Sequence, residues 1–338
     1  MSVLTSPQSS LRTRCDWRAA LKSAIRNPAE LCRILGLPAD LVDAAVRADR
    51  DFPLFAPLPY IARMEPGNPR DPLLRQVLPL EDELRDSPRF IADPVGEAAA
   101  KRLPNLLQKY QGRALMITTG ACAVHCRYCF RRHYPFDEGA NSPLGWESAI
   151  REIANDHSIG EVILSGGDPL TRVDAQLADL ASALEQIPHL RRLRVHTRMP
   201  IMIPQRVTRE LIAWLRETRL LTVVVVHANH PNELDGSVQK ALAGFVEAGI
   251  QLLNQTVLLR GVNDDLQSLV RLSSRLLECR VMPYYLHQLD QVAGAAHFEV
   301  PLEKGLRLID QMRTQLPGYA VPRYVREDPG AASKTVLA

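Results

Sequence analysis

Six short apolar runs rich in β-branched residues alternate with longer amphipathic stretches from residue 114 onwards. The runs predict six strands, at Ala114–Thr119, Glu161–Ser165, Leu193–Thr197, Thr222–His227, Leu252–Leu258 and Val281–Leu286. The longer stretches predict six helices, at Leu144–Asp156, Val173–Gln186, Val207–Glu217, Val238–Ala248, Leu266–Cys279 and Glu303–Leu316. Because a helix follows each strand, we expect an α/β fold with a parallel sheet.

The composition excludes several classes of protein. A net charge of +3 without a long polybasic run argues against a nucleic-acid partner. No apolar stretch approaches the length of about 18 residues that a membrane span needs, and the N-terminus lacks the apolar core of a secretory signal. Six cysteines in 338 residues, half of them clustered, argue against a secreted disulfide framework. We therefore expect a cytoplasmic protein without a membrane partner.

The first part of the chain differs from the rest. Residues 1–105 are rich in proline and partly helical, and we predict that they form a mostly helical covering segment. This segment should pack on the outside or edge of the sheet domain. The sheet domain is predicted to comprise residues 106–320, and residues 321–338 a C-terminal tail.

Unusual polar residues follow each predicted strand. The strands end in "TGACAVHC", "SGGDPL", "HTRMP", "HANHPNE", "NQTVLLRGVND" and "YYLHQLD". In a parallel α/β barrel these ends meet at one mouth, where the active site is built. Ordinary turn residues would explain about half of these positions, but they do not explain the histidines, arginines and cysteines. The pattern therefore predicts an active site at this mouth.

Three cysteines, Cys122, Cys126 and Cys129, lie within eight positions after the first predicted strand. A structural zinc site would need a fourth ligand, for which His125 or His133 is available. Three thiolates can instead hold three irons of a [4Fe–4S] cluster and leave the fourth iron open. The remaining cysteines, Cys15, Cys32 and Cys279, are isolated and typical of buried or tolerated thiols.

The CxxxCxxC spacing, with Tyr128 before the last cysteine, resembles the radical S-adenosylmethionine superfamily. That resemblance implies that S-adenosylmethionine binds the open iron. It also implies that the "SGGDPL" run, with Gly166, Gly167 and Asp168, binds the amino group of S-adenosylmethionine. The expected fold then becomes a partial parallel (β/α)6 barrel.

Longer runs narrow the resemblance. "KYQGRALMITTGACAVHCRYCFRRHYPF", "HTRMPIMIPQRV", "HANHPNEL", "LLNQTVLLRGVND" and "PYYLHQLDQVAGAAHF" resemble the lysine 2,3-aminomutases from about residue 70 to the C-terminus. This resemblance implies a second cofactor, pyridoxal 5′-phosphate, held as a Schiff base by Lys334. A lysine in such a tail is by itself more often solvated and inert. The family's glycine-rich run before this lysine is here "PGAAS".

The resemblance also assigns binding residues. It implies that the cofactor phosphate is held by Lys109, Tyr110, Arg113 and Arg198, and that His227 and Gln255 line the S-adenosylmethionine site. Lys109 stands where the aminomutases have an arginine. The positive charge is kept, but a lysine cannot bind a phosphate through two parallel hydrogen bonds as a guanidinium does.

The same resemblance assigns the substrate. Arg131 is implied to bind its carboxylate, and Asp290 and Glu327 its distal ammonium, with Glu327 one methylene longer than the family's aspartate. From the residues alone, Arg131 could be a surface charge, His227 a core histidine and each acid a solvated loop carboxylate.

These features predict an isomerase that converts L-α-lysine to (R)-β-lysine with a [4Fe–4S] cluster, S-adenosylmethionine, pyridoxal phosphate and an external one-electron reductant. "CAVHCRYCFRRHYPF" and "MPYYLHQLDQVAGAAHF" resemble most the branch that supplies β-lysine for elongation factor P, through a separate synthetase-like ligase. The chain also ends shortly after Lys334, without the extension of the catabolic enzymes. A catabolic lysine 2,3-aminomutase, a radical enzyme without pyridoxal phosphate and a non-catalytic metal-binding module are the alternatives. The oligomeric state stays open, a homo-oligomer included.

Overall fold

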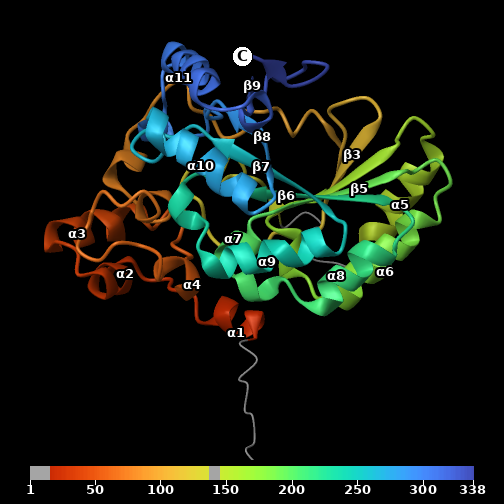
Figure 1. The fold of residues 1–338 in the computed structure, drawn as a ribbon, viewed down its shortest axis with the longest axis horizontal. Coiled ribbons are helices and arrows are strands. Elements are labelled where there is room, and N and C mark those ends of the chain that lie inside the picture. Colours follow the sequence, from red (N-terminus) through yellow and green to blue (C-terminus); the bar gives the residue numbers. More distant parts are fainter. Residues whose placement is uncertain (1–15, 137–144) are drawn as a thin grey trace, which may run out of the picture.

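A single sheet forms the centre of the computed structural model, which describes residues 16–136 and 145–338 (Figure 1). Seven parallel strands make up its middle and follow one another in chain order. They are β3 (Arg113–Ile117), β4 (Glu161–Ser165), β5 (Arg192–Thr197), β6 (Leu221–His227), β7 (Gln251–Val257), β8 (Met282–His287) and β9 (Arg323–Arg326). The first six overlap the predicted strands, and the predicted α/β class with a parallel sheet is confirmed.

Helices connect the parallel strands as expected. They are α5 (Gly145–Asn155), α6 (Asp174–Glu185), α8 (Arg209–Glu217), α9 (Gly236–Glu247), α10 (Leu266–Glu278) and α11 (Leu302–Gln315). Asp235 and Asp265 cap α9 and α10 by accepting backbone N–H groups, which fixes where these helices begin. Leu144, the predicted start of the first helix, lies outside the described residues.

Several short helical turns lie between a strand and the helix that follows it, or close to the last strands. They are η4 (Pro169–Thr171), α7 (Met199–Met202), η5 (Pro204–Arg206), η6 (Pro231–Glu233), η7 (Ala296–Phe298) and η8 (Gly318–Ala320). Three of them, η4, α7 and η6, follow directly after the loops at the ends of β4, β5 and β6. The polar strand ends are thereby held in defined positions.

The two faces of the sheet differ in character. Helices α6, α8 and α9 cover one face (Figure 1), where Leu193 and Val195 of β5 are fully buried in the main core. Side chains alternate along a strand, so Arg194 and His196 point to the opposite face, the interior of the partial barrel. This interior carries polar groups that an ordinary core would exclude.

Short antiparallel strands extend both ends of the sheet. Strands β1 (Lys101–Leu103) and β2 (Leu106–Leu107) lead into β3, and β10 (Thr335–Val336) pairs with β9. The sequence analysis did not predict β1, β2, β9 or β10, because runs of two to four residues are too short to show a periodicity. The sheet therefore crosses both predicted domain boundaries, at residues 105 and 320.

The covering segment contains α1 (Trp17–Lys22), α2 (Pro28–Leu35), α3 (Ala39–Ala48), α4 (Leu58–Ile61), η1 (Leu74–Gln76) and η2 (Glu81–Leu84). It does more than cover an outer face. Glu83 forms an ion pair with Arg127 of the cysteine loop, both side chains being almost fully buried. Charges buried this deeply need such partners. The covering segment therefore packs directly against the cysteine loop. None of the helices in the described part of the chain is long and apolar enough to cross a membrane.

Candidate active site

The loop after β3 carries Cys122, Cys126 and Cys129, whose thiols are all free. Burial raises the pKa of Cys129 to about 11, and Cys126 adds to the shift. Burial, Asp168 and the other two thiols raise the pKa of Cys122 well above its usual value. Because the thiols act on one another, they lie close together. Cys122 and Cys129 would give up their protons to a bound metal but not to neutral water.

These cysteines offer the three thiolates with which a chain holds three irons of a [4Fe–4S] cluster. Among residues 16–136 and 145–338, no three His, Cys, Asp or Glu side chains converge as ligands of one ion do. A [4Fe–4S] cluster binds each cysteine through a different iron and does not require this convergence. His125 Nδ1 lies 2.7 Å from the carbonyl of Pro53, and His133 Nε2 lies 3.2 Å from that of Ala293. Each of these histidines thus has one ring nitrogen beside a backbone carbonyl, and its other nitrogen remains able to bind a metal.

The glycine pair after β4 fits against the cysteine loop. A Cβ at Gly166 would lie 2.4 Å from the carbonyl oxygen of Thr119, and one at Gly167 only 2.2 Å from that of Ala121. Gly166 also has a φ of +129°, which side chains disfavour. The glycines are thus required for the close approach of two loops, a constraint that the sequence analysis ascribed only to the ligand.

Asp168 continues this loop and is buried. Its carboxylate accepts bonds from the Thr197 hydroxyl (2.7 Å), the Arg198 N–H (2.7 Å) and the Met199 N–H (3.0 Å). It therefore fixes the loop after β5 relative to the loop after β4. Its predicted contact with S-adenosylmethionine stays a prediction.

Lys334 lies beside four of the other predicted site residues. Its ammonium is paired with Glu327, which also accepts a bond from Tyr110 Oη (2.6 Å) and lies 3.3 Å from Lys109 Nζ. Burial alone would raise the pKa of Glu327, but Lys334, Tyr110 and Lys109 lower it to about 2. The guanidinium of Arg113 stacks on the Tyr110 ring, 4.7 Å from its centre. The tail lysine and the phosphate candidates of the β3 region therefore form one site.

This site has the donors that pyridoxal phosphate needs. Lys109, Arg113 and the Tyr110 hydroxyl can bind a phosphate next to an amine that can bind an aldehyde. The Nε of Arg113 is buried and has no partner among the described residues. Asp290 lies in the same site, because its pKa is raised to about 7 by burial and by Glu327, while Lys334 opposes the rise.

Two histidines in the barrel interior were missed by the sequence analysis. His196 of β5 and His287 of β8 each have a buried Nε2 without a partner among the described residues. Burial and nearby cations, Lys334 among them, lower the pKa of both imidazoles well below the usual value, so both are neutral. Their position one residue from or at the end of a parallel strand was the available signal.

Arg131 has partners that the sequence did not indicate. Its Nε and Nη2 donate to the carboxylate of Glu97 (2.8 and 2.7 Å), and its Nη1 to Ser165 Oγ (2.9 Å) and the Gly166 carbonyl (3.1 Å). The side chain is only 7% exposed, so it is not a surface charge. It connects the covering segment to the glycine loop, and its role toward a substrate carboxylate stays a prediction.

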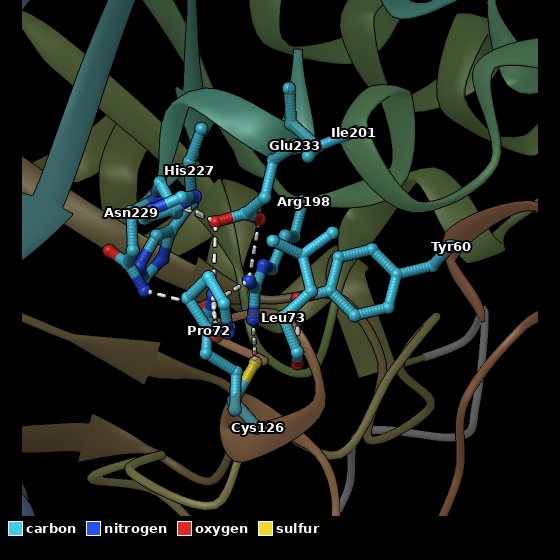
Figure 2. A network of polar contacts seen from close by, with 12 residues as sticks. Tyr60, Pro72, Leu73, Cys126, Arg198, Ile201, His227, Asn229 and Glu233 are labelled. Carbon is cyan, nitrogen blue, oxygen red and sulfur yellow. Dashed lines mark hydrogen bonds and ion pairs between the residues drawn. The ribbon is translucent and has the colours of Figure 1, made fainter. Parts of the chain in front are cut away.

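Arg198 lies apart from the other phosphate candidates in its contacts. Figure 2 shows its guanidinium between Cys126 and Glu233, with Nη1 2.8 Å from Cys126 Sγ and Nη2 2.8 Å from Glu233 Oε2. No contact with Lys109, Tyr110 or Arg113 is found among its bonds in the described structure. Long-range pairing, which no local motif reveals, brings Arg198 to the cysteine loop.

His227, the last residue of β6, and Gln255, two residues before the end of β7, lie side by side as register partners. The His227 ring lies 5.8 Å from that of Tyr128 in the cysteine loop. Burial, together with Arg198, lowers the pKa of His227 to about 3, so the imidazole is neutral. His227 therefore lies next to the cysteine loop with Gln255 beside it, and their contact with S-adenosylmethionine stays a prediction.

The sequence of this chain is similar to those of known proteins. The model of the radical SAM superfamily matches residues 116–272. L-lysine 2,3-aminomutase of Haemophilus influenzae is 45% identical over 97% of this chain and 97% of its own length. The enzyme of the same name from Escherichia coli is 45% identical over 96% and 95%, and that of Clostridium subterminale 33% identical over 95% and 77%.

Radical SAM enzymes use a [4Fe–4S] cluster with S-adenosylmethionine. Cys122, Cys126 and Cys129 lie within the matched residues, and their binding of the cluster stays a prediction. The identity extends over nearly the whole chain, well beyond the matched domain. This chain therefore belongs to the lysine 2,3-aminomutase family of radical S-adenosylmethionine isomerases.

Proposed function

We propose that this protein is a pyridoxal phosphate-dependent enzyme that converts L-α-lysine to (R)-β-lysine, which is then used to modify elongation factor P. One observation carries the choice of substrate: the alkylammonium group of Lys334 is paired with Glu327. The distal group of a lysine substrate is the same chemical group. Once Lys334 is bound to the cofactor, the Glu327 oxygen that it occupied can receive the distal ammonium group of the substrate.

The chain's own residues have distinct tasks in this proposal. Bound together, the two cofactors supply the hydrogen abstraction and the migration of the amino group. Cys122, Cys126 and Cys129 hold the cluster, with Gly166, Gly167, Asp168, His227 and Gln255 around the S-adenosylmethionine. Lys334 holds pyridoxal phosphate covalently, while Lys109, Tyr110 and Arg113 bind its phosphate. Arg131 orients the substrate carboxylate.

The acidic pair restricts the substrate to a cation. Asp290 and Glu327 both lie close enough to Lys334 for its charge to lower their pKa. Two buried carboxylates without a cation would repel each other, and an unpaired buried charge is strongly unfavourable. An anionic amino acid such as glutamate would add a third negative charge. Lysine supplies the missing cation, and we expect glutamate to be a poor substrate.

The raised pKa of Asp290 predicts a pH-dependent affinity. With a pKa of about 7, Asp290 is neutral below pH 7 and cannot pair with an ammonium group. The KM for lysine should therefore rise as the pH falls, by about tenfold between pH 8 and pH 6. Steady-state kinetics measure this, with Asp290→Asn as the matched variant, whose KM should be high and independent of pH. A flat wild-type profile between pH 6 and 8 would contradict the role of Asp290.

The link to elongation factor P rests on the resemblance of the cysteine loop and the "MPYYLHQLDQVAGAAHF" run to that branch. Deletion of the gene in the host should leave elongation factor P without β-lysine, as read from the mass of the purified factor. The wild-type gene should restore the modification, and a Cys126→Ala gene should not. Modified factor in the deletion strain would exclude the pathway and favour the catabolic alternative.

A further inference from the structure

Arg198 is the one charged side chain that joins the cysteine loop to both the barrel and the covering segment in the network of Figure 2. Its Nη1 donates to Cys126 Sγ (2.8 Å), and its Nη2 donates to Glu233 (2.8 Å) and to Gln76 Oε1 (2.6 Å). The side chains of Arg198 and Glu233 are 5% and 0% exposed. The pair is therefore sealed from water directly beside a cluster cysteine.

The guanidinium is held from several directions. The rings of Tyr60 and Tyr128 lie 5.8 and 5.7 Å from it, a distance at which aromatic rings attract cations. The backbone N–H of Arg198 donates to Asp168, which fixes the start of the side chain (2.7 Å). Together these contacts fix the position of the guanidinium against Cys126. This is the arrangement of a group that positions its neighbour.

Glu233 is held equally firmly. One carboxylate oxygen accepts bonds from the N–H groups of Asn229 (2.8 Å) and His230 (3.0 Å), and the Nε2 of Gln76 is 3.2 Å away. The other oxygen faces Arg198. A buried ion pair contributes little to stability compared with apolar side chains of the same size, so stability alone does not account for this pair beside Cys126.

We propose that the Arg198–Glu233 pair sets the reduction potential of the iron–sulfur cluster, with Arg198 acting as a positioning residue through Cys126. Hydrogen bonds to the cysteine sulfurs and nearby charges determine such potentials, and buried charges act strongly because they are poorly screened. Reduction adds a negative charge to the cluster. A cation that donates to a cluster sulfur stabilises the reduced form and raises the potential, and a nearby anion does the opposite.

The Nε of Arg198 gives a second sign that the guanidinium faces a ligand. It is buried and has no partner among the described residues. Nη1 and Nη2 of Arg198 already have partners, so its Nε–H remains as a donor for a ligand bound beside Cys126. This inference rests on the proposed binding of a cluster by the three cysteines.

Two variants with opposite expected effects test the inference. Arg198→Met removes the cation and its bonds, so the midpoint potential of the cluster should become more negative. Glu233→Gln replaces the carboxylate with a neutral amide of the same size, so the potential should become more positive. Arg198→Lys restores the cation without the fork and should lie between wild type and Arg198→Met. The potentials are measured anaerobically by redox titration monitored with electron paramagnetic resonance, with iron and sulfide determined for each sample.

A buried ion pair elsewhere serves as control. Arg206 is fully buried and pairs with Asp174 (2.8 Å), and none of its bonds reaches the cysteine loop. Arg206→Met should lower the melting temperature and leave the potential unchanged. It separates a general loss of stability from an effect on the cluster.

The outcomes are distinct. Opposite shifts of the midpoint potential in Arg198→Met and Glu233→Gln support the inference. If only one variant binds a cluster, a shift in its expected direction supports the inference and a shift in the other direction overturns it. Unchanged potentials, or shifts in the same direction, overturn it. Folded variants that both fail to load a cluster also overturn it, since the pair would then serve assembly. A wild-type protein that binds no iron would instead refute the proposed cluster itself.

Discussion

Alanine in place of Cys126 is expected to leave the protein folded but without a stable [4Fe–4S] cluster, and to abolish the cleavage of S-adenosylmethionine. In the proposed cluster each of the three cysteines binds a different iron, so the loss of one leaves an iron without its ligand. His125, the residue before Cys126 in sequence, is stacked on Phe52 with ring centres 5.0 Å apart. Iron and sulfide analysis, the absorbance of the cluster and the formation of 5′-deoxyadenosine measure the effect.

The other cysteines provide the control for this variant. Cys279 is buried and distant in sequence from the loop, and its thiol is free. Cys279→Ala should lose some stability through the missing sulfur but should keep the full cluster content. Cleavage of S-adenosylmethionine that persists in Cys126→Ala, with the cluster intact, would refute the assignment of the loop.

Alanine in place of Lys334 is expected to abolish both covalent binding of pyridoxal phosphate and the formation of β-lysine, while the cluster stays in place. Reduction of the wild-type holoenzyme with borohydride should fix the cofactor on the peptide that contains Lys334. The same treatment of Lys334→Ala should fix none. Mass spectrometry of the digested protein identifies the modified peptide.

A second lysine tests whether the effect is specific. Lys304 is paired with Asp264 and lies on α11, outside the site, so Lys304→Ala should bind the cofactor like wild type. A cofactor adduct on a lysine other than Lys334 would contradict the prediction. A wild-type enzyme that reacts with lysine but traps no cofactor would favour the radical enzyme without pyridoxal phosphate.

The strands and helices were predictable because each depends on residues that are neighbours in sequence. The alternation in "LRVHT" and the apolar run "LTVVVV" determine β5 and β6 almost to the residue. Strand β9 has four residues and is held by its pairing with β8 and β10, which a local pattern does not record. The sequence therefore predicted the layers of the fold but not the short strands at its ends.

The contacts within the candidate site were less predictable than the strands and helices. The cysteine loop has a recognisable motif, and Lys334 was named from a resemblance, whereas Gln76 and Arg198 meet across a separation of 122 residues. Arg198 was expected near a phosphate, but its bonds run to Cys126, Glu233 and Gln76. Which side chains meet depends on sheet register and on the path of the covering segment, and neither leaves a periodic pattern in the sequence.

The short antiparallel strands at the ends of the sheet have a consequence for self-association. An exposed strand edge offers unpaired N–H and C=O groups, to which a strand of another molecule can add. Here the outermost strands, β1 and β10, have three and two residues, and β1 carries the exposed charges of Lys101 and Arg102. The long parallel strands lie inside these ends. The barrel can thus remain open for its ligands without exposing a template for aggregation.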